Sequence, residues 1–273
     1  MKKSKKLIVC IPCFNAGKYI ARTLESLMSS SYKDFDVYIF DNASIDNSVE
    51  IINSFVKKYN NIHLYRNKKN IGMFPNMNKC LSVASGKYLK ILCADDILYK
   101  NCLLEQVNIL DRFDDVVLVY GSSNVLTNKF KRIMVRKHYK YSKKVNGGVL
   151  INKILLSGRN PLGEPTGVTL RTSVIKRNKL FFESAFKYIS DMDLWIKILQ
   201  YGNGYFCRNI QFGFCLHKGQ GTILFFKKAL KEHILLFRKY KDEYDLSNFE
   251  QFLLYLRLII NYFGKLFILF SIK

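Results

Sequence analysis

The first half of the chain alternates short apolar runs with longer segments in which apolar residues recur at helical spacing. The run at 7–12, "LIVCIP", is stopped by proline and is typical of a buried strand, whereas the spacing within 17–30 predicts a helix. Further strands are expected at 35–41, 62–66, 87–93 and 116–123, with helices at 44–59, at 73–84 and before the last of these strands. Strands that alternate with helices indicate βαβ units and a mainly parallel sheet.

The second half is less regular. Residues 160–171, "NPLGEPTGVTLR", form a Gly/Pro-rich segment that leads into a strand, and 210–222 predict a strand followed by a glycine-containing loop. Between them, "SDMDLWIKILQYG" predicts a helix with Ser190 as its N-cap and Gly202 as its stop. The sequence contains no internal repeat and no long linker.

The C-terminal segment Phe252 to Phe270 is almost wholly apolar, but Arg257, Asn261 and Lys265 interrupt it. Their i, i+4, i+8 spacing aligns them in one polar stripe of a helix. Charges near the centre argue against a spanning helix. We expect an amphipathic helix in the membrane interface with its basic residues toward the head groups, and the alternative is a helix that covers the core.

Composition narrows the class of protein. With 273 residues and 49% hydrophobic content the chain can bury a substantial core, which excludes a disordered protein. The 44 Lys and Arg against 21 Asp and Glu give a net charge of +23. Such a surface attracts nucleic acid, anionic lipid or phosphorylated ligands, although an AT-rich genome, which favours Lys, Asn and Ile codons, explains the charge equally well.

The cysteines and the N-terminus bear on where in the cell the protein is expected to act. Seven Cys are scattered along the chain, and the C-x-x-C of Cys10 and Cys13 has no second pair to complete a zinc site. Reduced cysteines in the cytoplasm are the better interpretation. The basic N-terminus carries an apolar run too short for a signal peptide, so we expect the protein to stay in the cytoplasm.

Polar residues follow the predicted strands. In open α/β sheets, ligands bind outside the carboxyl ends of the strands. These ends carry, in chain order, residues 12–15, 41–44 and 66–70, and then Asp95 with Asp96. The sequence therefore predicts a binding site along one edge of the sheet.

The acidic residues at these ends have two interpretations each. Asp95 and Asp96 either stabilise the start of a following helix or hold Mg²⁺ or Mn²⁺ against a diphosphate, because Mg²⁺ uses one or two carboxylates and fills its other positions with phosphates and water. Asp41 either closes a turn or accepts a hydrogen bond from a ring N–H of a pyrimidine base.

At this point several segments, in order, resemble a known family: "VCIPCFNAGKYIARTLESL", "DFDVYIFDNASIDNSVEII", "NKKNIGMFPNMNKCLSVASGKYLKILCADDIL" and "SDMDLWIKILQYG". From about Leu7 to His217 the chain closely resembles family 2 glycosyltransferases of GT-A fold, particularly bacterial enzymes that build surface polysaccharide. The resemblance implies a GT-A nucleotide-diphospho-sugar transferase fold with a mainly parallel sheet. It also implies transfer of a sugar from a nucleotide diphosphate donor with inversion at the anomeric carbon.

The resemblance also implies roles on the donor side. Pro12, Phe14 and Asn15 would line the nucleotide pocket. Asp41 would contact the base. Asn70 and Gly72 would belong to the loop beside the base and the ribose. In the D-x-D region, Asp96 would coordinate the metal and Asp95 would serve the ribose. Ala94 stands at the leading acidic position, so the motif reads A-D-D. His217, after a strand, lies near where some relatives place a metal or diphosphate contact.

On the acceptor side, "SDMDLW" resembles the E-D motif, which makes Asp191 the general base for the acceptor hydroxyl. Ser190 stands where Glu is usual, and the alternative is a capping-box-like arrangement of Ser190 with Asp193. A helix terminus would lower the pKa of Asp191 unless burial opposes it. Glu164 would contact the acceptor or satisfy loop amides.

The resulting hypothesis is a metal-dependent inverting glycosyltransferase that moves a sugar from UDP or dTDP to a lipid-linked oligosaccharide of O-antigen or capsule. It would act, without binding nucleic acid, as a peripheral protein at the inner face of the cell membrane. We expect a GT-A domain at 1–220, with a nucleotide half at 1–125 and an acceptor half at 126–220, and amphipathic helices at 221–273. The alternatives are a sugar-phosphate nucleotidylyltransferase and a nonenzymatic nucleotide- or lipid-binding descendant.

Overall fold

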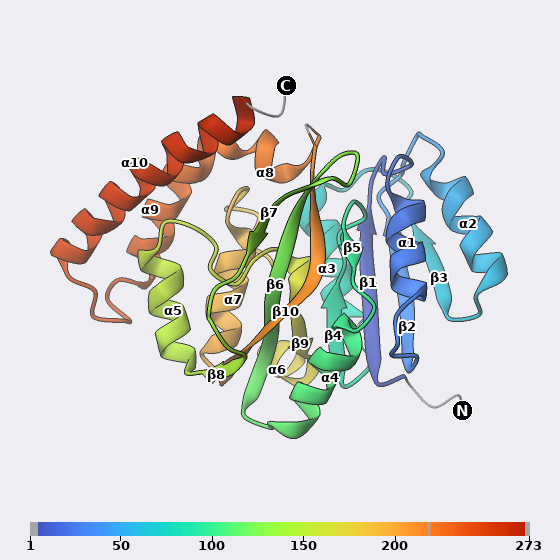
Figure 1. Cartoon of the computed structure of the whole chain (residues 1–273), viewed down its shortest axis with the longest axis horizontal. Helices are drawn as coiled ribbons and strands as arrows, with labels where there is room; N and C mark the ends of the chain where they lie inside the picture. Colours follow the sequence, from blue (N-terminus) through green and yellow to red (C-terminus); the bar gives the residue numbers. More distant parts are fainter. Residues whose placement is uncertain (1–4, 84, 218, 271–273) are drawn as a thin grey trace.

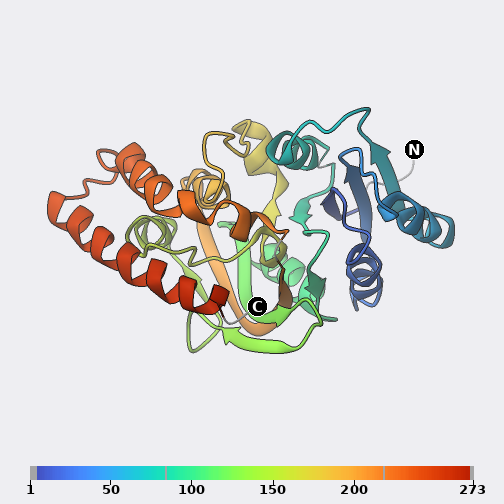
Figure 2. The same cartoon turned by 90° about the horizontal axis from the view of Figure 1, so that it is seen from above.

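The computed structural model describes residues 5–83, 85–217 and 219–270, apart from the side chains of 221, 222 and 263–270. One sheet lies between two layers of helices (Figures 1 and 2). Side chains of the first strand, β1 (Leu7–Cys13), alternate between the two faces: Val9 packs in one hydrophobic cluster, and Ile8 and Cys10 pack in the other. The continuous apolar run is therefore buried on both sides, as expected for a parallel strand.

The N-terminal half follows the predicted pattern. Next to β1 lie β2 (Phe35–Asp41) and β4 (Tyr88–Ile91), with β3 (Ile62–Arg66) at the edge beside β2. All pairings among these strands are parallel. Their carboxyl ends consequently meet at one edge of the sheet, which is the edge that the sequence predicts for the site.

The second half makes the sheet mixed rather than mainly parallel. The three-residue strand β9 (Thr169–Arg171) runs antiparallel to both β4 and β6 (Val116–Thr127), and β10 (Asn203–Leu216) runs parallel to β6. Further antiparallel pairings come from three short strands: β5 (Ile97–Leu98), β7 (Arg132–Arg136) and β8 (Lys143–Val145). With two, five and three residues, these strands are too short for their periodicity to be recognised.

The helices divide between the two faces of the sheet. One face is covered by α1 (Ile20–Met28), α2 (Ser48–Lys58) and α4 (Cys102–Arg112). The other core contains side chains of α3 (Met73–Ser82), α5 (Gly147–Leu156), α6 (Thr172–Arg177), α7 (Ser190–Leu199), α9 (Ala229–Tyr240) and α10 (Asn248–Phe270). The short helices are η1 (Pro165–Gly167), α8 (Gly221–Leu224) and η2 (Phe226–Lys228).

The start of α7 differs from the prediction. Ile189, not Ser190, is the N-cap residue, and the Ser190 hydroxyl donates to the carbonyl oxygen of Glu183 at 3.0 Å. Asp193 does not complete a capping box, since its buried carboxylate instead accepts bonds from Lys239 at 2.6 Å and Tyr240 at 3.0 Å. The helix ends at Leu199, before Gly202.

The C-terminal helix α10 also departs from the expected orientation. Arg257 Nη1 donates to the carbonyl oxygen of Leu156 at 2.7 Å, and Asn261 Nδ2 donates to that of Ser157 at 3.2 Å. Two members of the expected polar stripe thus bond to the end of α5, although Arg257 is still exposed, while the side chain of Lys265 lies outside the described residues. An apolar stripe is exposed instead: Phe249, Phe252, Leu256, Ile259 and Ile260. None of the helices in the described part of the chain has the length and hydropathy to cross a membrane.

Candidate active site

The ends of β1 and β2 are joined through Asn15. Its backbone N–H donates to Ser44 Oγ at 2.9 Å, and its Oδ1 accepts from the backbone N–H of Ile45 at 3.0 Å. Asn15 has φ of 49°, a conformation that asparagine tolerates better than most residues. Phe14 is 47% exposed beside it, and Pro12 is half-buried at the end of the strand. An exposed ring at a strand end is a suitable surface for a flat ligand.

Asp41 is fully buried at the end of β2. Its Oδ2 lies 3.3 Å from Arg66 Nε and accepts from the backbone N–H of Ser44 at 3.1 Å. The arginine at the end of β3 compensates the charge of this carboxylate. A ligand that donates to Asp41 therefore has to share the carboxylate with Arg66.

Asn42 organises the loop that contains Asn70 and Gly72, a contact that the sequence does not reveal. Asn42 Nδ2 donates to Asn70 Oδ1 at 2.8 Å and to the carbonyl oxygen of Gly72 at 3.2 Å. Asn42 Oδ1 accepts from Asn67 Nδ2 at 2.9 Å and from the backbone N–H of Ile71 at 2.9 Å. Gly72 has φ of 91°, which favours glycine, so the amide network and the glycine together fix this loop.

The acidic pair after β4 is asymmetric. Asp95 Oδ2 lies 2.7 Å from His217 Nε2, with side-chain exposures of 22% and 14% respectively. The imidazole stacks on the ring of Tyr19 with centroids 4.5 Å apart. His217, predicted from the sequence as a metal ligand, therefore contacts Asp95, and Tyr19 holds the ring in place.

Asp96 is almost completely buried. Its Oδ2 accepts from Thr166 Oγ1 at 2.6 Å, and its Oδ1 accepts from the backbone N–H of Cys215 at 3.0 Å. Burial, and secondly the charge of Asp95, raise the pKa of Asp96 well above its usual range. A nearby cation would relieve this penalty by stabilising the ionised form.

The donor atoms around this pair suit a hard cation. Cys93, Asp95 and Asp96 each place one potential ligand atom within 4.8 Å of the others. Burial raises the pKa of the Cys93 thiol well above its usual value, so the sulfur stays protonated and is a poor ligand. The carboxylates that remain are the ligand type of Mg²⁺ and Mn²⁺, which fits the prediction of either ion.

Asp191 occupies the first turn of α7 and is half-buried. Asn160 Nδ2 donates to its Oδ2 at 2.7 Å, and the backbone N–H of Met192 donates to its Oδ1 at 2.8 Å. Burial, with a contribution from the charge of Glu164, raises the pKa of Asp191 to about 7 despite these bonds. Burial thus outweighs the helix terminus, and the carboxyl group has the proton affinity that a general base needs.

Glu164 belongs to the segment at 160–166, which bonds to both acidic centres through Asn160 and Thr166. The charge of Glu164 also contributes to the raised pKa of both Asp96 and Asp191. Its Oε1 pairs with Arg136 Nη1 at 2.5 Å, while its Oε2 is buried without a hydrogen-bond partner among the described residues. Arg136, on β7, was not identified from the sequence, because nothing in the local sequence RIMVR indicates its partner.

The family of the chain follows from a comparison with family models. Residues 8–188 match the model described as Glycosyl transferase family 2, which is more than half of the chain. The protein belongs to glycosyl transferase family 2.

Curated relatives share about a quarter of their residues with this chain over the aligned regions. An uncharacterized glycosyltransferase of Rickettsia typhi is 26% identical over 220 residues, which cover 78% of this chain and 65% of the relative. The putative glycosyltransferase EpsE of Bacillus subtilis is 25% identical over 207 residues, which cover 74% of this chain and 69% of EpsE. The chain thus spans about two thirds of the length of these relatives.

Solved structures share the fold. S. aureus TarS 1-349 in complex with UDP-GlcNAc has a TM-score of 0.69 at 19% identity, over 84% of this chain and 66% of the TarS chain. Mannosyltransferase PcManGT from Pyrobaculum calidifontis in complex with GDP-Man and Mn²⁺ has a TM-score of 0.67 at 14% identity, over 94% and 73%. The predicted GT-A fold is confirmed by these likenesses.

Proposed function

We propose that this protein transfers a sugar from a UDP or dTDP sugar to a hydroxyl of a lipid-linked oligosaccharide, with inversion at the anomeric carbon. One observation carries the proposal: the segment at 160–166 bonds to both acidic centres, since Asn160 donates to Asp191 at 2.7 Å and Thr166 donates to Asp96 at 2.6 Å. A carboxyl group with a pKa of about 7 and an acidic pair suited to a diphosphate thus flank one loop in a chain of glycosyl transferase family 2.

The donor nucleotide would lie along the ends of β1 and β2. Phe14 offers an exposed ring face, and Asp41 would accept a hydrogen bond from the ring N–H that uracil and thymine share. Asn42 supports this site indirectly, since it holds the loop of Asn70 and Gly72 against the end of β2. The complexes of TarS with UDP-GlcNAc and PcManGT with GDP-Man are consistent with a nucleotide-sugar donor.

The diphosphate would be held at the end of β4. Asp96 would ligate Mg²⁺ or Mn²⁺, with Asp95 on the ribose side and His217 beside it. When bound, the cation compensates the charge that develops on the leaving nucleoside diphosphate. Thr166 and the backbone N–H of Cys215 fix the rotamer of Asp96, while Tyr19 and Asp95 orient the imidazole of His217.

The reacting centre would lie between Asp96 and Asp191. The acceptor oxygen attacks the anomeric carbon as its proton passes to Asp191, and the bond from that carbon to the phosphate oxygen breaks. Asn160 orients the carboxyl group through its 2.7 Å hydrogen bond. The unpartnered Oε2 of Glu164 would accept a hydrogen bond from a sugar hydroxyl. Asp193 is unsuited to the proton transfer, because Lys197, Lys239 and Tyr240 surround its carboxylate.

The acceptor side would face the inner surface of the cell membrane. The exposed apolar stripe of α10 and the net charge of +23 suit a peripheral contact with an anionic bilayer. The proposal keeps the expected boundaries: a GT-A domain at 1–220, with halves at 1–125 and 126–220, and C-terminal helices at 221–273. A role in O-antigen or capsule synthesis is the corresponding biological proposal.

A screen of nucleotide sugars by thermal shift with Mn²⁺ tests the function. A specific UDP or dTDP sugar is expected to raise the melting temperature progressively as its concentration exceeds its Kd, and the corresponding GDP or ADP sugars are the controls. Transfer to an acceptor with release of the nucleoside diphosphate would complete the test. Release of pyrophosphate from a nucleoside triphosphate and a sugar phosphate would instead establish a nucleotidylyltransferase, and no nucleotide binding at all would reject both activities.

A further inference from the structure

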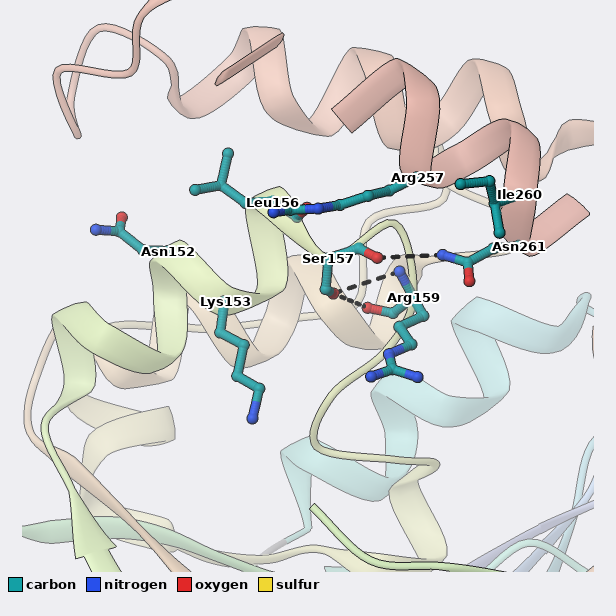
Figure 3. A pocket seen from close by; sticks show the side chains of 8 residues that line it. All are labelled: Asn152, Lys153, Leu156, Ser157, Arg159, Arg257, Ile260 and Asn261. Atoms are coloured by element: carbon teal, nitrogen blue, oxygen red, sulfur yellow. Dashed lines mark hydrogen bonds between the residues drawn. The ribbon is translucent and has the colours of Figure 1, made fainter. Parts of the chain in front are cut away.

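A hollow of about 570 Å³ lies between the end of α5 and α10 (Figure 3), and neither residue of the acidic pair after β4 lines it. Side chains from the last turn of α5, from the segment after it and from α10 line it. The lining residues are Asn152, Lys153, Leu156, Ser157, Arg159, Arg257, Ile260 and Asn261. We call this hollow the α5–α10 pocket.

The α5–α10 pocket is cationic. Of the eight lining residues three are basic and none is acidic, and none of the three forms an ion pair within the described residues. Lys153 Nζ lies 4.2 Å from the ring centroid of Tyr139, and Arg159 is exposed. Figure 3 shows Lys153 and Arg159 extending to the same side, away from α10. Basic side chains without an acidic partner give this hollow a positive potential, which favours an anionic ligand.

Helix polarity opposes an anion here, because the carboxyl end of a helix carries partial negative charge. In this structure that charge is compensated: Arg257 occupies the carbonyl oxygen of Leu156, and Asn261 occupies those of Ser157 and Gly158. The guanidinium of Arg257 has further N–H groups available after this single bond. Arg159 differs from Arg257 in this respect. Its guanidinium bonds to no carbonyl oxygen among the described residues, so it does not cap the end of α5.

The pocket is linked along the chain to a partner of the candidate base. Arg159 lies one residue before Asn160, whose amide holds Asp191. The positive field of the pocket also reaches the loop after β7, since burial and then the charge of Lys153 lower the pKa of His138 to about 4, with Arg159 contributing. The loop that holds the candidate base therefore begins at the cationic pocket.

The same pocket opens onto an apolar surface. Leu156 and Ile260 line it, and Ile260 is 71% exposed as part of the apolar stripe of α10. An anionic group in the pocket can therefore continue into an apolar chain along α10. This combination distinguishes the site from a pocket for a free inorganic anion.

We propose that the α5–α10 pocket binds the phosphate of the lipid-linked acceptor, through Arg159 and Lys153, while α10 carries the start of the lipid chain. This inference rests on the proposed function, which supplies the acceptor. The chemistry is a phosphate ester on an apolar chain. A membrane phospholipid offers similar chemistry, so the test has to separate the two sources.

The test measures binding without turnover. Dodecyl phosphate, below its micelle concentration and with EDTA to remove metal-dependent diphosphate binding, is titrated into the full chain by calorimetry. We expect saturable binding that Arg159→Ala weakens about tenfold, the usual loss for a charge-assisted contact. Arg177→Ala, an exposed arginine on α6, is the matched control and should bind as the wild type does. Dodecanol should bind at least about tenfold more weakly, because it lacks the phosphate.

Vesicles of phosphatidylcholine with about one part in five phosphatidylglycerol form the second arm. Arg159→Ala should co-sediment with them within about twofold of the wild type, since one exposed charge contributes little to bilayer binding. Equal loss in both arms would assign the pocket to bilayer head groups and overturn the proposal, as would unchanged binding of dodecyl phosphate by Arg159→Ala. Because neither arm needs a nucleotide sugar, a negative donor screen with intact dodecyl phosphate binding would reject the proposed function but not the pocket.

Discussion

Asn160 Nδ2 donates a 2.7 Å hydrogen bond to Asp191 Oδ2, and this contact joins the loop after α5 to the start of α7. The bond stabilises the ionised carboxylate, whereas burial and Glu164 stabilise the neutral acid. Asp191 is thereby balanced between two protonation states near neutral pH. Because this carboxyl group changes its protonation state near pH 7, both the rate of transfer and the stability of the fold should depend on pH in this range.

Asp191→Asn is expected to lower turnover by about a hundredfold or more, because a general base typically contributes that much, while the donor still binds. The substitution should also raise the melting temperature at pH 8. The folded state ionises this buried carboxyl group at a pKa of about 7, against 3.8 for an ordinary aspartate, so stability is lost as pH rises through this window. The increase in melting temperature over the wild type should be smaller at pH 5. Thermal melts at the two pH values and a transfer assay measure both effects.

Asp193→Asn is the matched control for this experiment. It removes the anion that Lys197 and Lys239 share, so it should destabilise the fold by about 3 kcal/mol in urea unfolding at pH 8. Full transfer activity in Asp191→Asn would reject the assignment of Asp191 as the general base.

Glu164→Gln should move the acidic limb of the pH–rate profile to lower pH. The wild type is expected to lose about tenfold in rate per pH unit below 7, because the base must be ionised. Removing the charge of Glu164 lowers the pKa of Asp191, so more base is ionised at pH 6. Glu183→Gln, which removes the partner of Lys197 instead, should leave the midpoint in place. A midpoint unmoved by Glu164→Gln would mean that Glu164 does not act on Asp191.

Asp96→Asn should abolish the stabilisation that UDP gives in the presence of Mn²⁺. The amide keeps the size of the side chain between Thr166 and Cys215 but removes its negative charge. The measurement is the thermal shift with UDP and Mn²⁺ against UDP and EDTA. Transfer that continues undiminished in EDTA would contradict the role of the metal.

The exposed stripe of α10 should bind bilayers without supporting the fold. Replacing Phe249, Phe252 and Leu256 by serine is expected to reduce co-sedimentation with anionic vesicles at least about fivefold, through the apolar area lost to the membrane. The melting temperature should change little, because these side chains are already exposed. Leu254→Ala, in the buried side of the same helix, should do the reverse and cost about 2–5 kcal/mol of stability. Undiminished co-sedimentation of the triple variant would reject the membrane contact.

The sequence predicts those features of this molecule that local pattern determines. The parallel strand β1 is a continuous apolar run, and β2, β3 and β4 are short segments rich in apolar and aromatic residues, so their positions and the polar edge they form could be inferred. The partners of the site residues could not, because they come from distant parts of the chain: Thr166 reaches Asp96 across 70 positions and Asn160 reaches Asp191 across 31. Asn42 was missed for a related reason, since its four hydrogen bonds depend on the shape of the loop at 67–72.

The error at Ser190 has a different origin. Serine before an apolar helical run is a good capping signal, but here its hydroxyl finds a carbonyl partner in Glu183, and the helix begins one residue earlier than predicted. The orientation of α10 is a similar case. The apolar and polar sides were both apparent in the sequence, but only tertiary packing decides that Arg257 and Asn261 cap α5.

The burial of Asp96 has a consequence for how the site is assembled. The two donors to its carboxylate lie 70 and 119 positions further along the chain, on η1 and β10. During synthesis the first 125 residues can emerge without either donor, so this carboxylate lacks both partners until β10 is in place. Contacts of such long sequence separation form late and slowly. The acidic pair is therefore a marker of completed folding: a truncated or partly folded chain that retains the nucleotide-side strands would still lack an ordered metal site.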